Sequence, residues 1–433
     1  MANLLILSQE LPFPIEKGNT LRVYHSAREL SKWHECILVA FGEPDAFVKA
    51  LESQEIFQKI YMVGKVSGTR SFMRHIRWSD KNFVKLSSPE YHNDVVRLLR
   101  EVVRKHQIDV VLTFPAILTE FVEPIQNVGK IVDSCDCLSL THERYFSYEK
   151  KNMAPKDRLL TWLTLQRSRQ FEKGLPASHD LVVSISPADL NRLKELNSRY
   201  AHKLRLIPNG VNPELMESNG GGPEIENSIV FWGNLEFAPN HTAVCYFYQH
   251  VYKPFLSEKK IKWYIVGSGA SACIRAMAEE DKNIIITGFI DRLYDFAARI
   301  PIMINPMQIG SGLKNKVLEA FALGRTVVSN ALGVEAIIGA QAGLHYIQAE
   351  KPEKYAEAII KYLHDPQARK KIGIDVRRLV EESYRWERIG KEWHRLVEEV
   401  ASANLRCGDV STFEMEERDT YNGLFQRIPR GGN

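Results

Sequence analysis

The sequence predicts an α/β protein built from two Rossmann-like halves, each a parallel sheet covered by helices. Short apolar and β-branched runs alternate with helical patterns along most of the chain, which is typical of parallel sheets with helices on both faces. The chain has 433 residues, too many for one ordinary core, so two domains are expected. The alternation breaks off once, around residues 207–225, and then restarts.

The first half contains six predicted strands separated by helical patterns. Helices are expected at Asn19–Leu30 and Tyr91–Lys105, where apolar residues recur at helical spacing. The strands are expected at Leu4–Leu7, Cys36–Ala40, Lys59–Val63, Val110–Leu112, Lys130–Val132 and Leu181–Ile185.

The second half follows a linker-like turn, Ile207–Pro213, and a glycine-rich stretch, Asn219–Pro223. Ligands of such sheets lie at the carboxyl ends of the strands, so we expect binding in the cleft between the halves. The tail after Asn404 is polar and is predicted to be disordered. Strands are expected at Ile229–Trp232, Trp263–Val266, Ile284–Thr287, Ile302–Asn305, Thr326–Ser329 and Leu344–Ile347.

Composition restricts the possible classes of protein. Hydrophobic residues make up 44% and charged residues 25% of the chain, and the formal net charge is +4, too small to indicate nucleic-acid binding by itself. No apolar run approaches the roughly 20 residues of a membrane-spanning helix. The N-terminus has the pattern of a first strand rather than of a cleaved leader. The six cysteines lack zinc-ligand spacing, so reduced thiols in the cytoplasm are expected.

The strongest functional signal is the stretch from Gly310 to Val328, a glycine-rich turn followed by a short helix, Gly324 and a strand. The glycines allow a close approach of backbone to ligand, and the first helical turn offers amides and a positive dipole to an anion such as phosphate. Lys314 and Lys316 add charge, and Glu319 is placed to bind a sugar hydroxyl. The alternative is a βα turn that binds no ligand and whose helix start faces solvent, because such turns have the same sequence pattern. The nucleotide-sugar site that we predict here comprises Gly310, Ser311, Gly312, Leu313, Lys314, Asn315, Lys316, Val317 and Glu319.

Other glycine turns follow neighbouring strands of the second half. Gly233 and Asn234 end its first strand, and Gly267 and Gly288 end the next two, so all four are expected to face the same cleft. Asn240 is interpreted as a helix N-cap rather than a ligand.

Two strand ends of the first half carry candidate acceptor residues. A proline-stiffened loop leads to Gly18, Asn19 and Arg22 and resembles a phosphate-facing loop, although a tight turn with an N-cap fits as well. Asp133 and Asp136 follow another strand, and either carboxylate can orient an acceptor hydroxyl or act as general base. An Asx turn is the alternative. His142 is interpreted as an ordinary surface histidine.

The segment Arg70–Trp78 mixes basic and aromatic residues. It fits contact with anionic lipid head groups or a lipid-linked substrate, at the inner face of the membrane. The same mixture of residues is also expected where basic side chains flank Phe, Ile and Trp side chains that face the core, and this is the alternative.

Several motifs resemble glycosyltransferase family 4, which has the GT-B fold of two facing Rossmann-like domains. Ile207–Val211 is similar to its interdomain PNGVD turn, Gly312–Val328 to its LEAxAxGxPVV helix, and Tyr384–Glu387 to its terminal YSW element. Phe231–Asn234 and Gly288-Phe289 match further turns, and the nearest subgroup is the sugar transferases of bacterial exopolysaccharide and exosortase loci. The last helix of this family crosses back to the first domain. The resemblance therefore implies domains of residues 1–206 with 385–403, and 207–384, before a tail at 404–433.

Two departures of the sequence from the family concern the donor site. Family members carry two glutamates eight positions apart, but Ser311 stands at the first position and only Glu319 remains. Many members also place an Arg and a Lys after the first donor-domain strand, where this chain has Asn234-Leu235-Glu236. Lys314 and Lys316 are the expected substitutes.

The resemblance implies retaining transfer of a hexose from a nucleotide diphosphate sugar to a glycan, lipid-linked or other hydroxyl acceptor, in polysaccharide or glycoconjugate synthesis. Lys314, Lys316 and the helix amides would stabilise the leaving diphosphate, Glu319 would hold the ribose, and Asp136 would act on the acceptor. No metal or other cofactor is required in this scheme. Two other classes remain open, namely a GT-B nucleotide-sugar epimerase and a non-catalytic nucleotide-sugar-binding partner.

Overall fold

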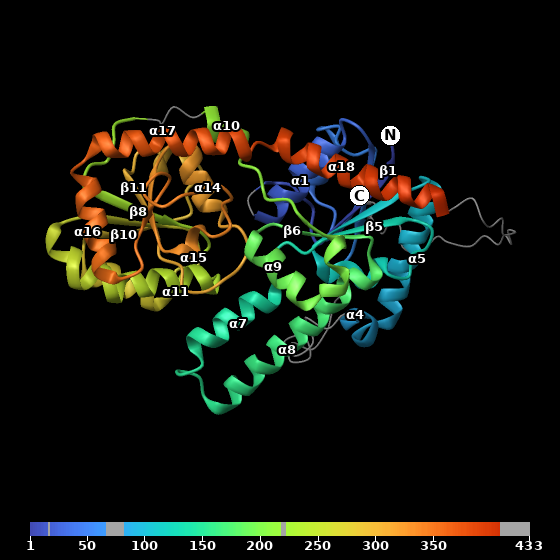
Figure 1. Ribbon diagram of the computed structural model, residues 1–433, viewed down its shortest axis with the longest axis horizontal. Helices are drawn as coiled ribbons and strands as arrows, with labels where there is room; N and C mark the ends of the chain where they lie inside the picture. Colours follow the sequence, from blue (N-terminus) through green and yellow to red (C-terminus); the bar gives the residue numbers. More distant parts are fainter. Residues whose placement is uncertain (16–17, 66–81, 218–221, 408–433) are drawn as a thin grey trace, which may run out of the picture.

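The computed structural model describes residues 1–15, 18–65, 82–217 and 222–407. They form two α/β domains placed side by side, joined by a linker and by the long C-terminal helices (Figure 1). The predicted fold class is confirmed, because both sheets are parallel throughout and both are flanked by helices. The predicted membrane segment Arg70–Trp78 lies outside the described residues, as does most of the predicted tail.

The first domain contains a seven-stranded parallel sheet in the order β3-β2-β1-β4-β5-β6-β7. Five of its strands are fully or mostly buried runs of aliphatic residues, as expected for a parallel sheet with both faces covered. The strands are β1 (Asn3–Ser8), β2 (Glu35–Phe41), β3 (Lys59–Val63), β4 (Val110–Phe114), β5 (Gly129–Asp133), β6 (Leu181–Ser184) and β7 (Leu204–Leu206).

Helices cover both faces of this sheet. One core cluster lies between the sheet and helices α1 and α18, and another lies between the opposite face and α5. The helices of the domain are α1 (Gly18–Leu30), α2 (Ala46–Glu52), α4 (Phe83–Ser87), α5 (Pro89–Lys105), α6 (Thr119–Val122), α7 (Leu138–Glu149), α8 (Pro155–Ser178) and α9 (Pro187–Leu196), with 3-10 turns at Ala116–Leu118 and Ser198–Lys203.

The second domain has a six-stranded parallel sheet in the order β10-β9-β8-β11-β12-β13. The chain therefore reverses direction across the sheet between β8 and β11, which places the switch point of a doubly wound sheet beside these two strands. The strands are β8 (Ser228–Trp232), β9 (Lys262–Val266), β10 (Ile284–Gly288), β11 (Ile302–Asn305), β12 (Thr326–Ser329) and β13 (Ile347–Gln348).

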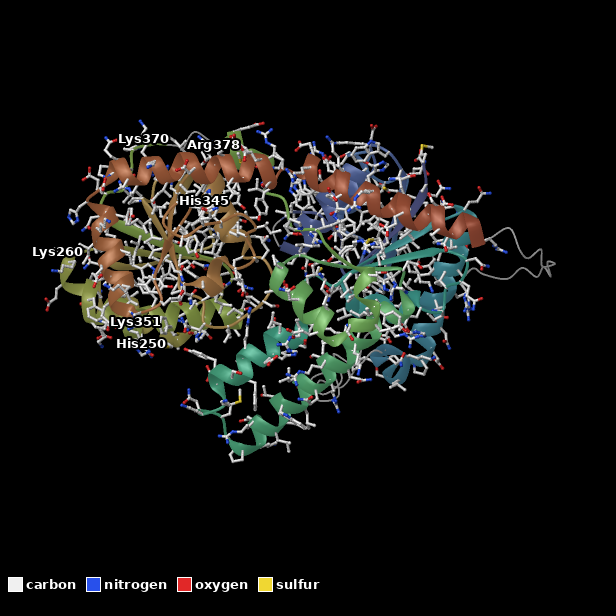
Figure 2. The ribbon with its side chains drawn as sticks, in the orientation of Figure 1. His250, Lys260, His345, Lys351, Lys370 and Arg378 are labelled. Carbon is white, nitrogen blue, oxygen red and sulfur yellow. The ribbon has the colours of Figure 1, made fainter. Side chains whose placement is uncertain are left out.

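Helices α14 and α17 cover one face of the second sheet, and α11 and α16 cover the other. Charged residues on the outside of this domain, such as Lys260, Lys370 and Arg378, point away from the sheets (Figure 2). The helices of the domain are α10 (Pro213–Glu217), α11 (Ala238–Phe247), α12 (Ala272–Glu280), α13 (Leu293–Ala297), α14 (Asn315–Ala322), α15 (Ala331–Val334), α16 (Pro352–Leu363) and α17 (Pro366–Ser383), with a π-helix at Tyr248–Leu256 and a 3-10 turn at Ser257–Lys259, and the chain ends in α18 (Trp386–Cys407).

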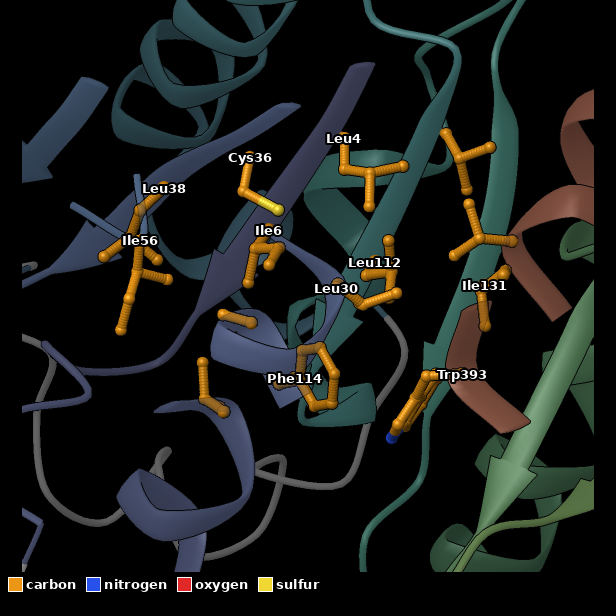
Figure 3. Packing of buried hydrophobic residues seen from close by; sticks show 14 of the residues in the cluster. Leu4, Ile6, Leu30, Cys36, Leu38, Ile56, Leu112, Phe114, Ile131 and Trp393 are labelled. Carbon is orange, nitrogen blue, oxygen red and sulfur yellow. The ribbon is translucent and has the colours of Figure 1, made fainter. Parts of the chain in front are cut away.

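Helix α18 returns to the first domain and completes its core. Trp393 is fully buried and its ring lies 5.5 Å from that of Phe114, among the aliphatic side chains of the central strands (Figure 3). Trp386 stacks on His25 with ring centroids 4.9 Å apart. A Cβ on Gly210 would lie 2.7 Å from the Trp386 ring, so the glycine of the interdomain turn allows this packing.

A few sequence predictions differ from the structure in detail. The three-residue strand β7 was not predicted, because so short a run carries no periodicity. The predicted strand Leu344–Ile347 is wrong for most of its length, since the strand is Ile347–Gln348. Helix α11 starts at Ala238 with Phe237 at its N-cap, so Asn240 lies inside the first turn and the N-cap prediction is wrong. Helix α18 continues to Cys407, beyond the predicted start of the tail at 404.

The linker between the domains is fixed by the buried side chain of Arg22, which is 2% exposed. Its Nε donates to Asp133 at the end of β5. Its two NH groups donate to the carbonyls of Ile207 and Pro208 and to Asn209 Oδ1, at 3.0, 3.2 and 2.8 Å. The guanidinium also lies over the Trp393 ring, 5.4 Å from its centroid. One cation thus joins α1, β5, the linker and α18.

No helix of the described residues is both long enough and apolar enough to cross a membrane.

We predict that Arg22→Met strongly destabilises the first domain. The substitution leaves Asp133 buried without its partner, and breaking a buried ion pair costs about 3–5 kcal/mol. Arg395→Met is the matched control, because Arg395 pairs with Glu392 on the exposed face of α18 and such pairs contribute about 0–1 kcal/mol. Urea unfolding followed by tryptophan fluorescence measures both, and equal stability of the two variants would contradict this role of Arg22.

Candidate active site

A cavity of about 1240 Å³ lies between the two domains. Its walls come from the ends of strands β5 and β8–β9, from α7 and from the loop before α14. This is the edge at which parallel sheets bind ligands. Twelve of the predicted site residues line it, namely Gly18, Asp136, Gly233, Asn234, Gly267, Gly310, Ser311, Leu313, Lys314, Asn315, Lys316 and Glu319.

Three glycines at the ends of β8, β9 and β10 lie against each other. Gly233 donates its N–H to Val266, and Gly267 donates to Gly288, at 3.0 and 2.9 Å. A Cβ on Gly267 would lie 2.0 Å from the Gly233 carbonyl oxygen. Gly267 has φ +142 and Gly288 φ +69, values that L side chains rarely adopt. The glycines therefore allow bare backbone to form this wall of the cavity.

Lys316 lies in the first turn of α14 and its ammonium faces the cavity. Its Nζ donates to Asn240 Oδ1 at 2.5 Å and lies over the Phe231 ring, 3.9 Å from its centroid. Burial lowers the pKa of Lys316 to about 7, with Glu319 opposing the shift and Lys314 adding to it. Lys316 thus lies beside the glycine wall as a readily titrated amine, and none of the ion pairs between described residues includes it.

Glu319 lies one turn further along α14, and two side chains of the second domain hold its carboxylate. Trp232 Nε1 donates to Glu319 Oε2 at 2.8 Å, and Tyr294 forms a second hydrogen bond with the carboxylate. Burial raises the pKa of Glu319, while these hydrogen bonds and Lys316 lower it. The side chain is therefore oriented before any ligand binds.

Residues of the first domain hold the loop from Gly310 to Lys314. Ser311 Oγ lies 2.6 Å from Thr141 Oγ1 and donates to the Cys137 carbonyl at 3.0 Å. Gly312 donates its N–H to Asp189 Oδ2 at 3.0 Å, so this amide already has a carboxylate partner. The Ser311 hydroxyl at the position of the family's first glutamate thus serves an interdomain contact.

Lys314 differs from Lys316 in its surroundings. Its Nζ donates to the carbonyls of Ser311 and Gly312, at 2.8 and 3.0 Å. Burial lowers its pKa, and nearby carboxylates, Glu335 first and then Asp136 and Asp189, oppose the shift. Lys314 therefore neutralises buried carboxylates and stabilises its own loop, which leaves Lys316 as the lysine better placed for a ligand.

Two further contacts tie this loop to the first domain. Arg144 of α7 forms a bidentate pair with Glu335, at 2.5 and 2.9 Å, and also donates to the Gly310 carbonyl at 2.7 Å. Asn209 of the linker donates to Asn315 Oδ1 at 3.0 Å. Both domains thus contribute to the conformation of this loop.

Two buried carboxylates meet at the same place. Burial raises the pKa of Asp136 to about 6, with Lys314 opposing the shift. Burial and the charge of Asp136 raise the pKa of Asp189 to about 7. A Cβ on Gly312 would lie 1.6 Å from Asp136 Oδ1, which explains the glycine at 312. Asp136 lines the cavity, and its position fits a group that binds or deprotonates an acceptor hydroxyl.

Some predicted residues lie elsewhere. Asn19 and Arg22 line a small separate pocket rather than the large cavity, and all of the groups that Arg22 binds belong to the fold. Asp133 pairs with Arg22 and accepts the Cys135 N–H at 2.8 Å, so the Asx-turn alternative is confirmed for it. Val317 is fully buried in the core. Gly288 and Gly312 do not line the cavity, but the Gly288 carbonyl accepts the N–H of Gly267 and the Gly312 N–H donates to Asp189.

Several wall residues were not among the predicted site residues. These residues are Trp232 at the end of β8, Tyr294 of α13 and Thr141 of α7. Their residue types alone gave no functional signal. The interpretation of His142 as a surface histidine is wrong: it is half-buried, lines the cavity and lies 2.7 Å from Ser168 Oγ. Burial lowers its pKa.

Within the described residues, one group of side chains has the spacing of metal ligands, namely His34, His394 and Glu398. It lies between the end of the α1–β2 turn and α18, apart from the cavity residues. The Ala2 N–H donates to His34 Nδ1, so Nε2 of the neutral ring carries the proton and donates to His394 Nδ1 at 2.8 Å. Hydrogen bonds thus account for both ring nitrogens of His34 without a metal.

Comparison with known proteins gives a partial family match and a clear fold match. Residues 226–365 match the family model of the Glycosyl transferases group 1. A search of the curated proteins found no match.

Solved structures resemble this chain over nearly its whole length. Sucrose-phosphate synthase from Thermosynechococcus elongatus is 16% identical with a TM-score of 0.68, covering 93% of this chain and all of that one. Alr3699/HepE of Anabaena in complex with UDP-glucose is 14% identical with a TM-score of 0.62, at coverages of 93% and 100%. TarM of S. aureus is 12% identical with a TM-score of 0.66, at 92% and 100%. The chain therefore has the GT-B fold, and its second domain matches the glycosyltransferase superfamily.

We predict that Gly267→Ala destabilises the protein much more than Gly343→Ala. Both glycines have positive φ, which costs roughly 1–2 kcal/mol for alanine, but only at 267 does the added methyl meet backbone, whereas at 343 it meets nothing within 4 Å. Thermal and urea unfolding of both variants measure the difference. Equal losses would show that the glycine wall is less tightly packed than described.

Proposed function

We propose that the protein is a retaining glycosyltransferase that moves a hexose from a nucleotide diphosphate sugar to a hydroxyl acceptor, in polysaccharide or glycoconjugate synthesis. The observation that carries the proposal is the pair of Lys316 and Glu319 on one turn of α14, facing a cavity between two GT-B domains. The group 1 match of residues 226–365, which include this helix, supports it. Assignment to family 4 and to the exopolysaccharide subgroup is part of the proposal.

The donor would bind on the second-domain wall. Gly233 and Gly267 leave room for a diphosphate against bare backbone, and the Lys316 ammonium lies beside Gly233, 3.1 Å from where its Cβ would be. A cation fixed at this point stabilises the negative charge that develops on the leaving diphosphate. Glu319, already oriented by Trp232 and Tyr294, would accept hydrogen bonds from the ribose hydroxyls. No metal is needed in this scheme.

The acceptor would bind on the first-domain wall, where Gly18, Asp136, Thr141 and His142 lie. The Asp136 carboxyl, with a pKa raised to about 6, is ionised at neutral pH and can accept a hydrogen bond from the acceptor hydroxyl. Cys36, Cys135, Cys137, Cys245 and Cys273 are unpaired, which supports a reducing compartment such as the cytoplasm as the location of the protein.

The proposal is tested by incubating the protein with UDP-, GDP- and ADP-sugars, with and without glycan acceptors, and measuring release of nucleoside diphosphate. Transfer with retained anomeric configuration, followed by NMR of the product, supports it. Conversion of the nucleotide sugar without an acceptor would instead indicate an epimerase. Binding in a thermal-shift assay without turnover would indicate a non-catalytic partner.

We predict that Lys316→Met lowers the rate of transfer about a hundredfold or more, because a buried donor to developing charge is lost. The apolar methionine side chain still fits over the Phe231 ring, so the fold should remain. Lys371→Met, on the exposed surface of α17, serves as the control and should leave the rate unchanged. Unchanged turnover in Lys316→Met would rule out this role for the lysine.

We also predict that affinity for the nucleoside diphosphate falls as pH rises from about 7.5 to 9. The pKa of Lys316 is lowered to about 7 in the free protein, so the amine is mostly neutral in this range. A bound diphosphate raises that pKa again, so binding takes up a proton and weakens by up to about tenfold per pH unit. Calorimetry in buffers of different ionisation enthalpy measures the uptake. Lys316→Arg, always charged, should abolish it, and uptake that persists in that variant would assign the proton to another group.

A further inference from the structure

The first domain carries a helical hairpin whose outer end projects from the body of the molecule. Helices α7 and α8 pack on each other and extend away from the first sheet (Figure 1). Buried residues of α8 begin at Leu165 and continue to Pro176. Before Leu165, all residues of α8 are exposed except Thr161 and Thr164, which are half-buried. The outer half of α8 thus lies beyond the core of the domain.

This outer end exposes a group of large apolar side chains. On α8, Leu159 is 57% exposed, Trp162 45%, Leu160 38% and Leu163 36%. Leu159, Trp162 and Leu163 stand three and four positions apart, so they share one face of the helix. Single exposed apolar residues are normal, but a contiguous patch marks a contact surface. We call these four residues the hairpin patch.

Basic residues surround the hairpin patch. Residues 149–167 contain five basic side chains and two acidic side chains, Glu149 and Asp157. Lys150, Lys151, Lys156 and Arg158 are all exposed. Among the salt bridges between described residues, none includes any of these four. The patch therefore combines apolar side chains, a tryptophan and unneutralised positive charge.

We infer that the hairpin patch docks the protein on an anionic membrane surface. Leucine and tryptophan side chains insert at the boundary between head groups and acyl chains, where tryptophan is favoured. Lysine and arginine side chains around them attract anionic lipid head groups. Charge complementarity selects this occupant over a second copy of the chain, because two such patches facing each other would bring their lysines together, and lysine is depleted in protein interfaces.

The geometry connects this surface to the cavity. Leu138, Thr141 and His142 at the start of α7 line the cavity wall on the proposed acceptor side. Helix α7 has 12 residues and is about 18 Å long, and its far end leads into the hairpin patch. Docking would thus hold the acceptor side of the cavity close to the membrane, whichever acceptor is used.

Co-sedimentation with vesicles tests the inference on the full-length protein. The wild type should bind vesicles of phosphatidylglycerol and phosphatidylcholine, and bind vesicles of phosphatidylcholine alone much more weakly. Trp162→Ser/Leu163→Ser should weaken binding to the anionic vesicles about tenfold or more. Lys150→Ser/Lys151→Ser should also weaken it about tenfold or more and remove most of its salt dependence.

The matched controls lie on α17. Ile374 is 54% exposed, so Ile374→Ser removes an equally exposed apolar side chain outside the patch, and Lys370→Ser/Lys371→Ser removes two exposed lysines. Both should leave vesicle binding unchanged. Thermal unfolding and binding of a nucleoside diphosphate should be unchanged in all four variants, which separates this inference from the proposed function.

Three results would overturn the inference. The first is a wild type that binds neither kind of vesicle. The second is binding that the hairpin substitutions leave intact. The third is a wild type that dimerises without binding vesicles and becomes monomeric in Trp162→Ser/Leu163→Ser, measured by sedimentation, which would assign the patch to a second copy of the chain.

Discussion

The hinge between the two domains is built around one buried guanidinium. Arg22 binds Asp133 at the end of β5 and the carbonyls of the linker, so the positions of both depend on it. Asp136, three residues beyond Asp133, lines the cavity. Asn209, which also binds Arg22, in turn binds Asn315 at the start of α14. A residue that touches no proposed substrate therefore sets the relation between the two walls of the site.

The two lysines of the α14 loop illustrate how burial distinguishes residues of one type. Lys314 lies among the carboxylates of Asp136, Asp189 and Glu335 and donates to its own loop. Lys316 has a neutral amide and an aromatic face beside it. An incoming diphosphate would have to compete with three carboxylates for Lys314 but with one amide for Lys316. The surroundings, rather than the formal charges, decide which lysine can serve a ligand.

The sequence predicted the fold well, because parallel strands buried on both faces have unmistakable apolar runs and their glycine-ended turns mark one edge of the sheet. It also predicted that Gly233, Gly267 and Lys316 lie near the same cleft. Contacts between segments far apart in the chain could not be predicted from the sequence. Asp189 has a capping pattern with Ser186, and that contact exists, but nothing in this pattern shows that its carboxylate also binds Gly312. Arg22 lies on helix α1, whose first residue, Gly18, lines the cavity. Its side chain nevertheless binds the linker instead of facing the cavity, and only the packed structure shows this.

The contacts of Ser311 and Gly310 have a consequence for the way the molecule moves. Each joins the loop before α14 to helix α7 or to the residue before it, on the other domain. Opening the cleft would remove these partners together, while the hydrogen bonds that Lys314 donates within the loop would remain. Separation of the domains and loss of these loop contacts are therefore coupled. A ligand that favours the loop conformation held by these contacts also favours the closed cleft.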